Sequence, residues 1–192
     1  MAGVAGPMLR SHRDGAIRFL LGLVVGGTVG AAALAIPVYL LGVVAQQALP
    51  EQWRLWLLAA VAAGFGVADL ANRTPHVWRQ VPQRFIHVMP PGKLGLAWGI
   101  DLALLVTTQK VVSFLWVTVA AVVLLQPATA VPVLVFVAVL ATVPVAVWSL
   151  HGVRIRDSIG PWDRVGLPQT RMVSGIVILA LSLTTVVDAS QL

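Results

Sequence analysis

Three ionisable residues lie inside, or at the end of, long apolar stretches of the chain. Lys110 lies near the middle of the apolar segment 94–125, and Asp101 precedes it in the same segment. Asp69 lies near the end of the apolar segment 53–70. Ionisable groups inside a membrane usually face a cavity or a partner group, and they often mark the path of an ion or a proton. These residues therefore form the candidate intramembrane polar site.

The spacing of these residues limits how they can interact. Asp101 and Lys110 are separated by between two and three helical turns and point to different sides of one helix, so direct pairing is not expected. Each could pair across helices, and Asp69 could face Asp101 or a basic loop. Lys110 could bind an anion, a lipid headgroup or a proton. Alternatively, it reaches the membrane surface by snorkelling, or the helix breaks near Thr107 and Thr108 and leaves Lys110 at an interface.

Motifs for catalysis or metal binding are missing from the sequence. The absence of cysteine excludes disulfides and thiolate metal sites. The four histidines lack metal-ligand spacing, and the sequence contains no HExxH, GxSxG or P-loop pattern. We therefore predict a protein that is not an enzyme and that has no catalytic residues, no metal site and no cofactor.

Composition predicts the elements that must position the polar residues. The chain is 58% hydrophobic and only 10% charged, whereas an ordinary soluble domain is about 25% charged. The expected fold class is an all-α integral membrane protein with about five transmembrane helices, because a spanning helix needs about 20 apolar residues. A cytoplasmic tail (1–16) would precede a single transmembrane domain (17–192). The expected helices cover roughly 17–46, 53–70, 94–125, 130–150 and 172–189.

Basic residues predict the orientation of these helices. In a five-helix arrangement, eleven of the thirteen Lys and Arg residues lie on one side: Arg10, Arg13, Arg18, Arg73, Arg79, Arg84, Lys93, Arg154, Arg156, Arg164 and Arg171. Only Arg54 lies near the opposite side. Cytoplasmic loops are enriched in Lys and Arg, so the N-terminus is expected inside and the C-terminus outside. Topology therefore explains the net charge of +6, and nucleic acid is not an expected partner.

The basic loops have a second possible role at the membrane surface. Arg79 and Arg84, like Arg154 and Arg156, alternate with apolar residues. A short interfacial helix on anionic lipid would show such a pattern. Ordinary loops on the cytoplasmic side would show it as well, and both interpretations stay open.

Small residues form a stripe on the first expected helix. Gly22, Gly26 and Gly30 recur every four residues and therefore lie on one helix face, where another backbone can approach closely. This face could form an interface with a partner protein or with a second copy of the chain, or it could pack within the chain.

The order of elements suggests an internal duplication of a two-helix unit. A long helix, a tight turn, a second helix and a basic segment occur twice, and an offset of 77 residues places Gly22 on Gly99, Pro50 on Pro127 and Arg79 on Arg156. The copies would be parallel, related by an axis along the membrane normal. The alternative is that any protein built of helical hairpins shows this order.

Three short motifs carry a resemblance to known proteins. They are the run Arg-Gln-Val-Pro-Gln-Arg-Phe at 79–85, Trp98-Gly99, and the Val-Thr-Thr run at 106–108. In these motifs the chain resembles a group of small actinobacterial polytopic membrane proteins, which are loosely similar to the cytochrome-biogenesis and methylamine-utilisation membrane families. It departs from the group at Asp101, Ala103 and Lys110, where the group has small glycine positions. The resemblance implies a polytopic membrane protein but no particular activity, and without cysteine no transfer of disulfide reductant.

Two functions are compatible with these patterns. The first is a non-enzymatic small subunit, or an assembly or stability factor, of a larger membrane complex, with the bilayer and other membrane subunits as partners. The second is a self-standing carrier, or a transporter of lipid or anions, that uses Lys110. In both cases the expected location is the bacterial cytoplasmic membrane.

Overall fold

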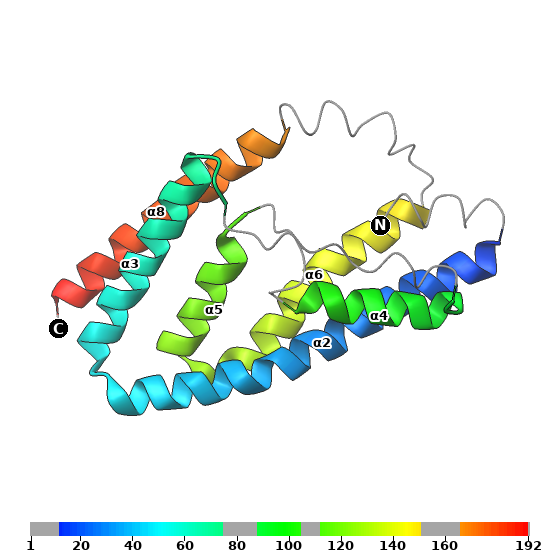
Figure 1. The fold of residues 1–192 in the computed structure, drawn as a ribbon. Coiled ribbons are helices and arrows are strands. Elements are labelled where there is room, and N and C mark those ends of the chain that lie inside the picture. Colours follow the sequence, from blue (N-terminus) through cyan, green and yellow to red (C-terminus); the bar gives the residue numbers. More distant parts are fainter. Residues whose placement is uncertain (1–11, 75–87, 105–111, 151–165, 192) are drawn as a thin grey trace. The chain divides into compact units, whose positions relative to one another are not determined.

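The computed structural model describes residues 12–74, 88–104, 112–150 and 166–191 (Figure 1). Within these ranges every regular element is a helix, which agrees with the expected all-α class. The elements are α2 (Arg13–Ala48), α3 (Glu51–Leu70), α4 (Pro91–Ala103), α5 (Phe114–Leu124), the 3-10 helix η2 (Pro127–Thr129), α6 (Ala130–Leu150) and α8 (Leu167–Ser190).

Four helices in the described ranges are long and apolar enough to cross a membrane. They are α2, α3, α8 and the helical stretch Pro127–Pro144, which includes most of α6. A helix rises about 1.5 Å per residue, so 20 residues match the roughly 30 Å hydrocarbon core of a bilayer. The expectation of several membrane-length apolar helices is therefore confirmed.

The described residues of the apolar segment 94–125 form two helices, α4 and α5. Thr107 and Thr108, where a break was the alternative to one long helix, lie outside the described ranges. Helix α4 ends because Leu104 adopts an extended backbone with ψ of 115°, and α5 begins only after Ser113. The sequence between them is polar and β-branched, which disfavours a continuous helix. With 13 and 11 residues, α4 and α5 are each shorter than the roughly 30 Å that a spanning helix must cover.

The chain forms two compact units, which are described separately. Unit 1 contains residues 1–34, 77–109 and 131–160, and unit 2 contains residues 35–76, 110–130 and 161–192. Helix α2 contributes its first part to unit 1 and its second part to unit 2. The expected single domain over 17–192 concerns the packing of these units on each other and stays a prediction.

In unit 1, α2 and α4 run parallel and are in backbone contact (Figure 1). A Cβ atom added at Gly22 would lie 2.4 Å from the Gly92 carbonyl oxygen, and one at Gly26 would lie 2.2 Å from the Leu96 carbonyl oxygen. Real Cβ atoms do not approach so closely, so only glycine permits this spacing. The glycine stripe therefore packs on α4 of the same chain.

Helix α4 contributes two glycines, Gly95 and Gly99, to the same backbone contact. A Cβ atom at Gly95 would lie 2.0 Å from the Phe19 carbonyl oxygen, and one at Gly99 would lie 2.3 Å from the Leu23 carbonyl oxygen. Lipid tails are as apolar as side chains, so close packing of this kind is what favours helix association in a bilayer. Weak Cα–H···O contacts also become possible at this separation.

A buried cluster fills the same end of the α2–α4 interface. It consists of Phe19, Leu20 and Leu23 from α2 with Leu94 and Trp98 from α4. The rings of Phe19 and Trp98 meet edge to face, with their centroids 5.7 Å apart, a favoured geometry for aromatic pairs.

In unit 2, α3 and α8 run antiparallel, side by side (Figure 1). Gly66 of α3 faces Gly175 of α8, where an added Cβ atom would lie 2.8 Å from the Gly66 carbonyl oxygen. Further along the pair, the Ser182 hydroxyl donates a hydrogen bond of 2.8 Å to the Ala59 carbonyl. Helix α5 packs on the same pair through Val117, in a cluster with Ala62 and Ile178.

We expect Gly26→Ala to destabilise the protein by about 1–3 kcal/mol, because the new methyl group overlaps the α4 backbone. Gly64→Ala is the control, since an added Cβ atom there meets nothing within 4 Å; it should be neutral or slightly stabilising. Unfolding of the purified protein in detergent measures both. Equal stability of the two variants would contradict the backbone contact.

Candidate functional site

The carboxylate of Asp69 is the most densely hydrogen-bonded polar group that the structure describes. Its side chain is 1% exposed. One oxygen, Oδ1, accepts hydrogen bonds from the hydroxyls of Thr74 (2.7 Å) and Ser113 (2.7 Å). The other, Oδ2, accepts from the Ser113 backbone N–H (2.9 Å) and the Ser174 hydroxyl (2.8 Å). A carboxylate has about four acceptor positions, so this one has a donor for each.

The donors come from three different parts of unit 2. Thr74 follows the end of α3, Ser113 directly precedes α5, and Ser174 lies on α8. One buried carboxylate therefore links the end of α3 to the beginning of α5 and to the first half of α8. Hydrogen bonds to a charged group typically contribute about 1.5–3 kcal/mol each, and removing the shared acceptor affects all of them together.

The turn after α3 places Thr74 within reach of Asp69. The Asn72 N–H donates to the Asp69 carbonyl (3.0 Å), and the Arg73 N–H donates to the Ala68 carbonyl (2.8 Å). Asn72 has a positive φ of 56°, and Asn tolerates this conformation better than most residues. These features define a Schellman motif, which ends the helix and reverses the chain.

Arg171 of α8 binds the same turn through hydrogen bonds to Asn72. Its guanidinium donates a short hydrogen bond to the side-chain oxygen of Asn72 and a longer one of 3.4 Å to the Asn72 carbonyl. Arg171 therefore joins the beginning of α8 to the end of α3, one helical turn from Ser174.

The opposite end of α5 is also held by α3. The Arg54 guanidinium donates a hydrogen bond of 2.9 Å to the Leu124 carbonyl. The Gln46 amide of α2 donates one of 3.0 Å to the Leu125 carbonyl. The last carbonyls of a helix have no partner within the helix, and in a membrane no water replaces that partner. Arg54 and Gln46 supply donors to two carbonyls at this end, those of Leu124 and Leu125.

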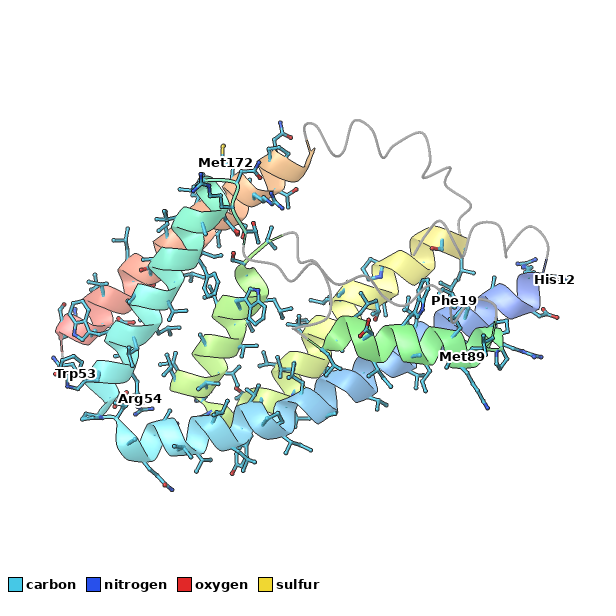
Figure 2. The ribbon with its side chains drawn as sticks, viewed as in Figure 1. His12, Phe19, Trp53, Arg54, Met89 and Met172 are labelled. Carbon is cyan, nitrogen blue, oxygen red and sulfur yellow. The ribbon has the colours of Figure 1, made fainter. Side chains whose placement is uncertain are left out.

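Asp69 and Arg54 together match the electrostatics of α5. We call this pair the α3 clamp. Helix α5 runs antiparallel to α3, so the carboxylate meets its amino end and the guanidinium meets its carboxyl end. A helix carries partial positive charge at its amino end and partial negative charge at its carboxyl end. Both charges of the clamp therefore stabilise α5. Figure 2 labels Arg54 in the first turn of α3.

The sequence-predicted site residues have different outcomes. Asp69 lies in unit 2 as part of the clamp, and its bonds go to hydroxyl and amide donors instead of a basic loop. Asp101 lies on α4 in unit 1 and is half-buried. Other predicted residues lie outside the described ranges: Lys110, Arg79, Arg84, Arg154 and Arg156.

Sequence reasoning missed the hydroxyl donors and the role of Arg54. The donor side chains are of common residue types and lie far apart in the sequence, at Thr74, Ser113 and Ser174. No local sequence pattern therefore identifies them as partners of Asp69. Arg54 did carry a signal, because it is the one basic residue near the predicted outer side. The structure explains this exception by its hydrogen bond to the end of α5.

The geometry of the clamp favours a structural role over substrate binding. The Asp69 carboxylate is buried, and donors from its own chain occupy its acceptor positions. No group of three or more His, Cys, Asp or Glu residues capable of holding a metal ion occurs in the described ranges. What the arrangement can do is hold an anion and a cation at fixed positions beside α5.

Comparison with protein-family models, with curated proteins and with solved structures gives no match to this chain.

We expect Asp69→Asn to destabilise the protein by about 2–3 kcal/mol. Asn retains one acceptor oxygen but turns an amide N–H₂ toward two of the donors, which then lose their acceptor. Thermal or detergent unfolding of the purified protein measures the loss. Asp188→Asn, at an exposed position near the end of α8, is the matched control and should change stability by less than about 0.5 kcal/mol. Equal stability of the two variants would refute the clamp.

Proposed function

We propose that this protein is a non-enzymatic, multi-pass subunit, or an assembly or stability factor, of a larger membrane complex in a bacterial cytoplasmic membrane. The observation that carries the proposal is that the Asp69 carboxylate is buried and accepts four hydrogen bonds from donors of its own chain. This residue is the intramembrane acid whose surroundings are fully described, and its carboxylate holds helices together. A transported substrate would need polar groups that it can reach.

The outer surfaces of the helices support a partner within the membrane. Large apolar side chains are exposed on each membrane-length helix, including Leu41 on α2, Val67 on α3, Phe136 on α6 and Leu183 on α8. Apolar surface of this kind suits lipid tails, and it equally suits the transmembrane helices of other subunits.

The helix directions support the proposed topology. In an arrangement of spans that alternate in direction, with the N-terminus on either side, the first and third apolar segments begin on the same side, and α2 and α4 do run parallel. The second and last segments run in opposite directions, and α3 and α8 do run antiparallel. The count of five spans and the possible duplication remain part of the proposal.

A carrier is the second candidate, and one observation favours it. The third apolar segment is divided into α4 and α5, which belong to different units. Discontinuous helices form the binding sites of many carriers, where the amino end of a half-helix meets an anionic substrate. In this chain Asp69 already occupies the amino end of α5, which makes the subunit function the better supported of the two. Lys110 would serve the carrier function.

Purification from the native membrane tests the proposed function. After extraction in a mild detergent, native mass measurement should find the chain in stable complex with at least one other membrane protein, in a constant ratio. A monomer that retains its fold and carries no partner would contradict the subunit function and favour the carrier.

Labelling with a membrane-impermeant maleimide tests the topology. The chain has no cysteine, so single substitutions give an unambiguous signal. In intact cells, Ser190→Cys near the end of α8 should react, and His12→Cys before α2 should react only after the membrane is permeabilised. The reverse pattern would show the opposite orientation, and reaction of both would show an even number of spans.

A further inference from the structure

In unit 1, two exposed basic residues, Arg18 of α2 and Lys93 of α4, lie at the same level near the amino ends of these helices. An added Cβ atom at Gly92 would lie 3.8 Å from the Arg18 carbonyl oxygen and 3.9 Å from the Arg18 Cβ atom. Lys93 is the next residue after Gly92, so it lies at the same level as Arg18. Both side chains are exposed. The close glycine packing of the two helices fixes this arrangement.

Each cation directly precedes apolar sequence. Arg18 is followed by Phe19 and Lys93 by Leu94, and both of these residues are buried in the α2–α4 cluster. Figure 2 labels Phe19 near this end of α2. On the outer surface of the same two helices, Leu21 is 61% exposed and Leu96 is 39% exposed. A pair of cations therefore lies one turn or less from exposed aliphatic side chains.

Among the described residues, the charge near the amino ends of α2 and α4 is positive. Arg13 and Asp14 lie in the first turn of α2, before Arg18, and both are exposed. Asp14 precedes Arg18 by one helical turn and can offset part of its charge. Arg13 and Lys93 remain, so the amino ends of the two helices still attract anions.

We propose that Arg18 and Lys93 bind the phosphodiester of an anionic phospholipid, whose acyl chains lie along Leu21 and Leu96. This inference rests on the proposed membrane location. Arginine pairs with phosphate through two parallel hydrogen bonds, and lysine contributes a point charge. The adjoining exposed leucines favour a lipid over free phosphate, because only a lipid covers apolar surface as well.

Reconstitution of the full chain in nanodiscs tests this binding. The discs contain phosphatidylcholine with a minor fraction of phosphatidylglycerol, and mass spectrometry counts the lipids retained after detergent extraction. A basic residue near the surface contributes about fivefold in affinity. The double variant Arg18→Gln/Lys93→Gln should therefore lose about tenfold or more of the phosphatidylglycerol enrichment. Arg18→Lys/Lys93→Arg, which keeps both charges, should retain most of it and confirm that the fold tolerates changes here.

The matched control compares two single variants, Arg18→Gln in the pair and Arg73→Gln at an exposed position in unit 2. Arg18→Gln should lower the phosphatidylglycerol enrichment about fivefold, and Arg73→Gln should lower it by less than about twofold. An equal loss in the two single variants would overturn the site in favour of diffuse charge. Unchanged enrichment in the Arg18/Lys93 variant, or full displacement of the lipid by inorganic phosphate, would also overturn it. A chain that fails to enter the nanodisc would instead refute the membrane location itself.

Discussion

Helix α5 depends on α3 for the charges at both of its ends. It has 11 residues, too few to cross a bilayer alone, and no side chain of its own caps its first turn. In an apolar surrounding, unpaired backbone groups at helix ends cost several kcal/mol. Asp69 supplies the acceptor at one end and Arg54 a donor at the other, and both match the helix dipole. The position of α5, and through Ser174 that of α8, follows from this constraint.

The helices of the two units associate through different interactions. In unit 1, glycines on α2 and α4 bring two backbones into contact, so dispersion forces act over a short distance. In unit 2, the glycine pair Gly66 and Gly175 joins α3 to α8. Hydrogen bonds from Ser174 and Ser182 also link the two helices, and their geometry restricts how the helices can pack. A fully satisfied polar network favours one arrangement over others.

The sequence predicted the helices well where one physical signal dominated. Apolar length identified α2, α3, α6 and α8, and the four-residue glycine spacing identified the face of α2 that packs on α4. Local signals left the segment 94–125 undecided, because its apolar length favoured one helix and the polar run in its middle favoured a break. They failed for the clamp: Asp69 stood out as a charge in an apolar context, but Ser113 and Ser174 are 44 and 105 residues away. Only the folded chain brings these residues together.

Hydrogen exchange of the α5 backbone in nanodiscs tests most directly whether the α3 clamp holds this helix. In the unaltered protein the amides from Ser113 to Leu124 should exchange slowly, because both helix ends are fastened. Replacing Asp69 by Asn should raise exchange first at Ser113, and replacing Arg54 by Gln should raise it first near Leu124, while the amides of α4 stay unchanged. Exchange in α5 that is unaffected by either replacement would contradict the account.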